Sequence, residues 1–252
     1  MKLIALLLCL YSTPALAYDF SMNGYRISST LIEQVDFEEV QFIRTVTIHF
    51  RDAKLCWKQP HVPNEKMINR VIYGCLMAYR RFWTGQPERM YQLFALIISE
   101  SGGNNIGNPT DPSYGVCHAS FASAHTACYI YAIPHPKCKL CTQTCNGLTI
   151  YDGRTFKNWL EESVSFNIMC GAGELERALG KTNNDLVRAI GIYKYGAAGY
   201  IRAVERLNGK PITALQVWQG YSNVLEWLMC LRTKTLIQDS DNCGCLPIQI
   251  LK

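Results

Sequence analysis

Apolar residues recur three or four positions apart over most of the chain from residue 64 onward. This spacing places them on one face of an α-helix, which can pack against a neighbouring helix. The pattern predicts helices over these segments: residues 64–83, 87–101, a small-residue segment through 127, 159–175, a segment that begins after Asn184 or Asp185, and 212–231. The sequence therefore predicts a mainly α globular domain in which short loops join amphipathic helices.

Residues 40–50 show a different pattern, in which apolar and polar positions alternate. The apolar positions of even number are Val40, Phe42, Val46, Ile48 and Phe50. Alternation that includes β-branched residues is typical of a β-strand. We therefore expect a strand here, within a small amino-terminal extension of residues 18–66 that packs on the main domain.

One charged residue, Glu100, lies on a predicted apolar helix face. It shares that face with residues three, four and seven positions before it: Leu93, Leu96 and Ile97. Burial and the negative end of the helix dipole both disfavour an ionised carboxylate, so we expect the pKa of Glu100 to be raised. A carboxyl that stays protonated near neutral pH can act as a general acid. The alternative is a Glu that faces solvent or pairs with an Arg.

The first residues of the chain have the layout of a secretory signal peptide. Lys2 gives a basic start, residues 3–10 are apolar, and Ala15-Leu16-Ala17 matches a cleavage site. The apolar run is shorter than the roughly 20 residues that cross a membrane. We expect residues 1–17 to be removed and the protein to be periplasmic or secreted, without a membrane anchor.

Export changes the meaning of the 12 cysteines in the chain. Because Cys9 leaves with the signal peptide, an odd number remains, and disulfides are expected with at least one cysteine left over. Cys138, Cys141 and Cys145 lie in a loop over residues 134–152, and their spacing also suits zinc ligands. In an exported chain the disulfide-rich loop is the favoured interpretation, so no metal and no cofactor are expected.

The charge balance is mildly basic, with a formal net charge of +5. This suits an anionic polymer as a partner but is too weak to indicate nucleic acid. The sequence has no phosphate-binding glycine loop and no Gly-x-Ser-x-Gly nucleophile motif. Since these motifs are absent, Glu100 remains the candidate reactive group.

Four short motifs occur in order along the chain. They are the Glu-Ser step in residues 98–102, a loop motif in 113–118, an Asn-Ile-x-x-Gly-Ala motif in 167–175, and a Tyr-x-x-Gly motif in 192–196. Their order and spacing resemble the catalytic domain of the soluble lytic transglycosylases, a goose-lysozyme-like family that cleaves peptidoglycan. The resemblance implies a lysozyme-like domain over residues 67–232, followed by a cysteine-containing tail over 233–252.

The resemblance also implies a mechanism with one carboxyl. Glu100 would protonate the β-1,4 bond between N-acetylmuramic acid and N-acetylglucosamine, and would then take a proton from the sugar's own C6 hydroxyl to close a 1,6-anhydro ring. Tyr193 would bind near the acetamido group or orient Glu100. Ser101, His118 and Tyr221 are the other implied substrate-binding residues. The implied partners are peptidoglycan glycan strands. The biological role stays open between cell-wall turnover and opening of the wall for a secretion or conjugation apparatus or for a phage.

Two positions depart from the family pattern. His118 stands where the family usually has Gln, and Lys194 stands where it usually has Asn. Three other functions stay open. A hydrolytic lysozyme of the same fold would need a second carboxylate, such as Asp111 or Asp152. A non-catalytic cell-wall binder would keep the fold without the reaction, and a secreted interaction protein would use the cysteine-rich loop.

Overall fold

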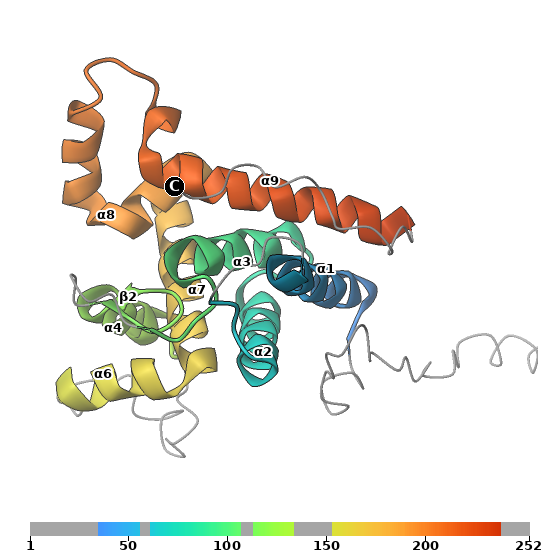
Figure 1. The fold of residues 1–252 in the computed structure, drawn as a ribbon. Helices are drawn as coiled ribbons and strands as arrows, with labels where there is room; N and C mark the ends of the chain where they lie inside the picture. Colours follow the sequence, from blue (N-terminus) through green and yellow to red (C-terminus); the bar gives the residue numbers. More distant parts are fainter. Residues whose placement is uncertain (1–34, 56–60, 107–112, 134–152, 238–252) are drawn as a thin grey trace, which may run out of the picture.

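The structure is a computed structural model that describes residues 35–55, 61–106, 113–133 and 153–237. Helices and one two-stranded sheet make up this part of the chain (Figure 1), and the mainly α prediction is confirmed. The elements are α1 (Phe37–Leu55), α2 (Glu65–Phe82), α3 (Glu88–Ser101), β1 (Ser113–Tyr114), β2 (Ala119–Ser120), α4 (Phe121–Tyr131), α6 (Gly153–Glu162), α7 (Val164–Lys181), α8 (Leu186–Glu205), the short 3-10 helix η3 (Ile212–Ala214) and α9 (Gln216–Ile237).

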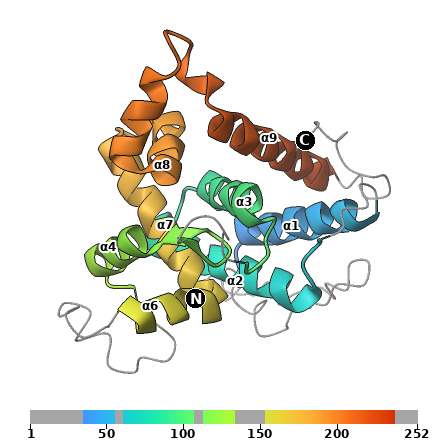
Figure 2. The same ribbon diagram turned by 60° about the vertical axis from the view of Figure 1, so that its left-hand side comes forward.

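Helix α7 is the central element of the fold. It packs against α2, α4, α6 and α8, and both views show it passing through the middle of the molecule (Figures 1 and 2). Gly74 lets α2 approach α7 closely, since a Cβ at this position would lie 2.6 Å from the Ile168 Cδ1 atom. Because such a contact is shorter than van der Waals distance, a larger residue at Gly74 would displace the Ile168 side chain.

The predicted strand over residues 40–50 is wrong, because this segment is part of helix α1. The alternating positions Phe42, Val46 and Phe50 are also four residues apart, so they share a helix face and are buried. At the helix start, Asp36 and Glu39 accept hydrogen bonds from each other's backbone N–H groups, which is a capping-box arrangement. Local β-propensity is overridden here by the cap and by burial.

Helix α1 packs against α9 and α2. Glu39 accepts two hydrogen bonds from the guanidinium of Arg80 on α2, at 2.6 and 2.7 Å. His49 accepts a hydrogen bond at Nδ1 from the Trp227 indole on α9, at 3.0 Å. Burial lowers the pKa of His49 to about 4, so its ring is neutral at physiological pH.

The ends of α2 and α3 confirm the predicted helices. Asn64 caps α2 by accepting a hydrogen bond from the Met67 backbone N–H at 2.9 Å. Helix α3 follows Pro87 and ends at Gly102, whose φ of +63° is a left-handed conformation that glycine adopts without strain. This ending places Glu100 in the last turn of α3.

Helix α8 begins after its cap Asp185 and is broken at Gly196, where φ is 67° and ψ is 163°. The chain then returns through η3 into α9, which lies across α3 and α1 (Figure 2). Within the described ranges, no helix is both long enough and apolar enough to cross a membrane. The predicted signal peptide, the cysteine-rich loop and residues 238–252 of the tail lie outside the described residues.

Four cysteines form part of the core of the described residues. Cys75, Cys117, Cys128 and Cys170 are buried free thiols, so the expected disulfides are not present at these positions. The Sγ atoms of Cys128 on α4 and Cys170 on α7 lie 2.8 Å apart. A disulfide between them would need the two sulfur atoms to approach to about 2.0 Å.

Candidate active site

Glu100 lies at the centre of a small charged cluster. Its side chain is only 4% exposed, and its Oε2 atom accepts a hydrogen bond from Lys194 Nζ on α8 at 2.5 Å. The Nδ1 atom of His118 lies 3.3 Å from the same Oε2. Three of the four motifs noted in the sequence contribute to this cluster, because α3, the turn after β1 and α8 each bring one charged or titratable group to it.

The charges around Glu100 overturn one expectation from the sequence. Burial raises the pKa of Glu100, but the hydrogen bond from His118 and the charge and hydrogen bond of Lys194 outweigh it, and the pKa lies below its ordinary value. Glu100 is therefore ionised at neutral pH in this structure, not held protonated as we expected. Burial acts in the expected direction, but the cation that opposes it, Lys194, comes from a helix distant in sequence.

His118 lies at the end of the tight turn that joins β1 and β2. Its φ of +44° is an uncommon conformation for a residue with a Cβ atom. The buried amide of Asn167 on α7 holds this turn, since its Nδ2 donates to the Tyr114 carbonyl at 2.8 Å and its Oδ1 accepts from the Cys117 N–H at 2.9 Å. The His118 Nε2 atom is buried without a hydrogen-bond partner among the described residues.

Tyr193 supports this turn from the opposite side. Its hydroxyl donates to the backbone carbonyl of Cys117 at 2.9 Å. Burial raises the pKa of Tyr193 well above its ordinary value, and the charges of Glu174 and Glu100 add to the rise. The structure therefore places the hydroxyl on the loop beside His118 and not on the Glu100 carboxylate.

The hydroxyls of Ser101 and Tyr221 are both used inside the fold. The Ser101 hydroxyl donates a hydrogen bond to the Val116 carbonyl at 2.7 Å, and this bond connects the end of α3 to the His118 turn. Tyr221 on α9 is fully buried and donates to the Gln92 carbonyl at 3.3 Å. Gln92 lies about two turns of α3 before Glu100, so the structure does not bring the Tyr221 hydroxyl to the carboxylate.

A second buried carboxyl, Glu174, was not singled out from the sequence. It lies on α7 one turn after Gly171, and its charge contributes to the raised pKa values of Cys117 and Tyr193. Burial raises the pKa of Glu174 to about 8, against an opposing effect of Arg177. Its signal in the sequence was the spacing from Asn167 and Gly171, which places all three on one side of α7.

Metal chemistry has no candidate site in the part of the chain that the structure describes. No group of three or more His, Cys, Asp and Glu side chains comes together there. The cysteine-rich loop with Cys138, Cys141 and Cys145 lies outside the described residues, as do Asp111 and Asp152, the candidate second carboxylates.

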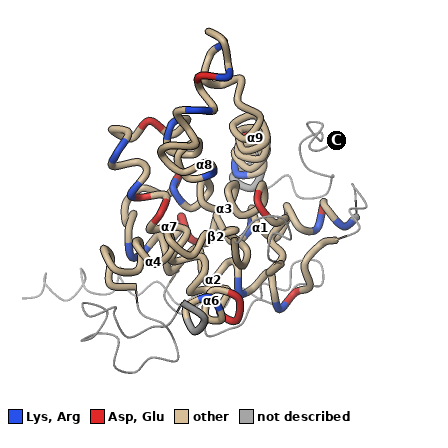
Figure 3. Tube along the Cα trace, turned by 90° about the vertical axis from the view of Figure 1, so that its left-hand side faces the viewer, with Lys and Arg blue, Asp and Glu red and all other residues tan. Residues whose placement is uncertain are grey.

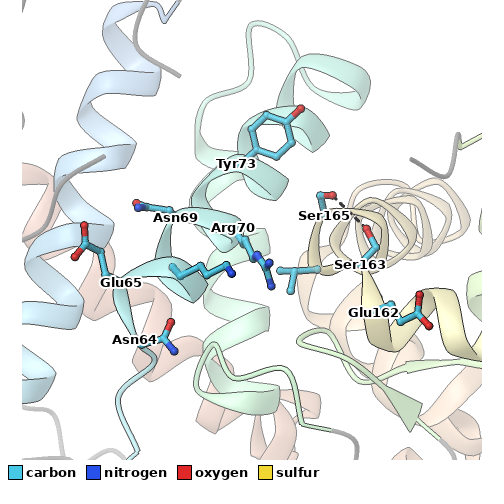
Figure 4. Close-up of a pocket in the computed structure, with 10 residues that line it drawn as sticks. Asn64, Glu65, Asn69, Arg70, Tyr73, Glu162, Ser163 and Ser165 are labelled. Atoms are coloured by element: carbon cyan, nitrogen blue, oxygen red, sulfur yellow. Dashed lines mark hydrogen bonds between the residues drawn. The ribbon is translucent and has the colours of Figure 1, made fainter. Parts of the chain in front are cut away.

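One surface hollow lies beside the amino-terminal half of α2. This groove of about 800 Å³ lies between the first half of α2 and the α6–α7 junction, and Figure 4 shows Arg70 pointing from α2 toward the start of α7. None of the predicted site residues lines it. It adjoins the loop after Glu100, because Asn104 and Asn105 donate to the carbonyls of His61 and Glu161, which lie beside its two walls.

Another hollow, of about 470 Å³, lies between the end of α8 and η3. Its lining includes Tyr195, which follows Lys194 in the chain, and the arginines Arg202 and Arg206. Figure 3 shows the basic positions of this part of the molecule in blue along α8. This hollow is therefore basic and lies on the same helix as the residue that contacts Glu100.

Comparisons with protein-family models, with curated proteins and with solved structures give no match for this chain.

Proposed function

We propose that the protein is a peptidoglycan lytic transglycosylase with a lysozyme-like fold and that Glu100 is its acid and base. The observation that supports this most strongly is the convergence of the four motifs. Ser101 bonds to the Val116 carbonyl, Asn167 holds the same loop, and Tyr193 donates to Cys117. These hydrogen bonds join α3, α7, α8 and the β1–β2 turn around one buried carboxylate.

The geometry suits a reaction that uses a single carboxyl. Both contacts to Glu100 are made at Oε2, and Oε1 accepts no hydrogen bond from a described residue. In the proposed reaction a proton on Glu100 passes to the glycosidic oxygen as the bond to the muramic acid C1 breaks. The substrate's acetamido group stabilises the positive charge at C1. The Glu100 carboxylate then accepts the C6 hydroxyl proton, and the C6 oxygen bonds to C1.

The resting ion pair also imposes a requirement on this mechanism. Glu100 must gain a proton before it can act as an acid, and the Lys194 ammonium opposes this. The same ion pair favours the second candidate, a non-catalytic cell-wall binder in which Lys194 permanently neutralises the carboxylate. A hydrolytic lysozyme is the alternative within the same fold, and it would release a product that has gained water.

The test is mass analysis of products released from purified peptidoglycan by the wild-type protein and by Glu100→Gln. The transglycosylase proposal predicts anhydro-muropeptides from the wild type and none from the variant. Products heavier by one water would identify a hydrolase. Binding to peptidoglycan without any release, equal in both proteins, would identify the non-catalytic binder.

The cellular setting follows from the same proposal. An exported enzyme of this kind acts in the periplasm or outside the cell, where its partners are peptidoglycan glycan strands. Local opening of the wall for a secretion or conjugation apparatus is one use of such an activity.

A further inference from the structure

Lys194 lies between the Glu100 carboxylate and the solvent. Its side chain is 38% exposed, whereas that of Glu100 is 4% exposed. Lys194 therefore remains accessible to a ligand that approaches from outside, and such a ligand would meet the ammonium before it met the carboxylate. An ammonium can exchange one carboxylate for another with little change in its own environment.

Further cations lie on α8 beyond Lys194, on the other side of the break at Gly196. Arg202 and Arg206 line the hollow between α8 and η3, are exposed, and make no ion pair with a described carboxylate. Arg188 on the first turn of α8 differs from them, since it pairs with Asp185 at 3.1 Å. Two unpaired guanidinium groups in one hollow suit carboxylates, which they can bind with two hydrogen bonds each.

Tyr195 lines the same hollow as the two arginines. A Cβ atom at Gly199 would lie 3.2 Å from the Tyr195 Cβ and 3.9 Å from an Arg202 guanidinium nitrogen. Tyr195 and Arg202 therefore both lie close to Gly199, and a side chain at this position would crowd Tyr195. An aromatic ring beside cations is an arrangement that can accept both the apolar face and the charged substituents of a sugar.

We propose that Lys194, Arg202 and Arg206 form a carboxylate-binding subsite for the glycan strand, and that a substrate carboxylate takes Lys194 away from Glu100. This inference rests on the proposed function and deepens it, because it specifies a strand with free carboxylates as the substrate. The carboxylate can be the lactyl group of a muramic acid that has no peptide, or a group on the stem peptide. A strand without free carboxylates leaves the ion pair between Lys194 and Glu100 intact.

The exchange would prepare Glu100 for its role as an acid. The titratable or charged groups near Glu100 are Lys194 from α8, His118 from the β1–β2 turn, Tyr193 and Cys117. Burial raises the pKa values of Tyr193 and Cys117, so both are neutral. Once Lys194 has moved, burial of Glu100 is opposed by His118 alone, and the carboxylate can take up a proton more readily.

The experiment compares three forms of the same glycan strands: strands without peptides, these strands with their lactyl carboxylates converted to methylamides, and strands with intact stem peptides. The proteins are the wild type, Lys194→Met, Lys194→Arg, Arg202→Gln/Arg206→Gln, and Lys181→Met as a control that removes one exposed charge at the end of α7. Both the dissociation constant and kcat/KM are measured, and thermal unfolding checks that each variant is folded.

We expect the wild type and Lys181→Met to bind the carboxylate strands about tenfold or more tightly than the methylamide strands, which is the size of a charge-assisted contact. Lys194→Met and the double arginine variant should lose this preference, and Lys194→Arg should keep part of it. A preference confined to peptide-free strands identifies the lactyl carboxylate, and one confined to intact strands identifies the stem peptide. In Lys194→Met, the acid limb of kcat/KM should also move to higher pH.

Equal binding of charged and methylamide strands by the wild type would overturn the subsite, as would a preference that survives in Lys194→Met and in the double variant. The binding measurement keeps this separate from the proposed function. A wild type that prefers carboxylate strands but releases no product would contradict the transglycosylase and retain the subsite. A wild type that cleaves and binds all strands equally would contradict the subsite and retain the transglycosylase.

Discussion

The Tyr193 hydroxyl donates a hydrogen bond to the backbone carbonyl of Cys117 at 2.9 Å, and so ties α8 to the turn that carries His118. The two residues are far apart in the sequence. Their contact lies beside Gly171 on α7, which has no side chain. A Cβ atom at Gly171 would lie 2.8 Å from the Cys117 Sγ and 3.1 Å from the Tyr193 hydroxyl oxygen. The close approach of three elements at Gly171 therefore depends on this small residue and on one hydrogen bond.

Tyr193→Phe tests that bond. Because the Cys117 carbonyl would lose a partner in a buried setting, we expect the free energy of unfolding to fall by about 1–3 kcal/mol. Chemical denaturation measures this change, and Tyr129→Phe is the matched control because Tyr129 is 54% exposed. Equal stability of Tyr193→Phe and the wild type would show that the hydroxyl does not hold the turn.

The lowered pKa of Glu100 makes a prediction about acid stability. The hydrogen bonds and charge of His118 and Lys194 stabilise the ionised form in the folded state. This contribution is present above the pKa of an unfolded Glu, about 4.3, and is lost as the pH falls through the lower folded pKa. The stability difference between the wild type and Glu100→Gln should therefore shrink between pH 5 and pH 3. A difference that stays constant across this range would contradict the ion pair.

Glu174 should show the opposite dependence on pH. Burial raises its pKa to about 8, so between the unfolded value and about 8 the folded state binds more protons than the unfolded state. Stability should fall across this interval by at most about 1.4 kcal/mol per pH unit. Glu174→Gln should flatten the profile, because its amide does not titrate. Parallel profiles for the variant and the wild type would place Glu174 in solvent.

The pair Cys128 and Cys170 should form a disulfide under oxidising conditions. Their Sγ atoms lie 2.8 Å apart, and a bonded pair is separated by about 2.0 Å. Burial raises the pKa of Cys170 well above its ordinary value, so few thiolates are present and exchange with an oxidised small disulfide should be slow. Peptide mapping after such treatment should find the two peptides linked. Alkylation of both cysteines after prolonged treatment would show that they stay reduced.

Parts of the fold could be predicted because their signals are local. Asn64 and Gly102 mark the ends of helices through caps that involve neighbouring residues, and the structure has both. Helix α1 was missed because Phe42, Val46 and Phe50 satisfy a spacing of two as well as a spacing of four. Periodicity alone does not separate these cases when most positions of a segment are buried.

The sequence predicted the burial of Glu100 but not the electrostatics around it. The burial of Glu100 follows from its own helix face, and its position was inferred from the sequence. Its ionisation depends on Lys194, which lies in a different helix, and no local pattern indicates that the ammonium reaches the carboxylate. The hydrogen bonds that Ser101 and Tyr221 donate to backbone carbonyls likewise depend on packing between elements distant in the chain.

The central claim is that Glu100 performs the cleavage and that no water enters the product. Mass analysis of fragments from purified peptidoglycan, wild type beside Glu100→Gln, tests it most directly. The account predicts anhydro-muropeptides from the wild type and no release from the variant. Equal release by both proteins, or products that have gained one water, would contradict it.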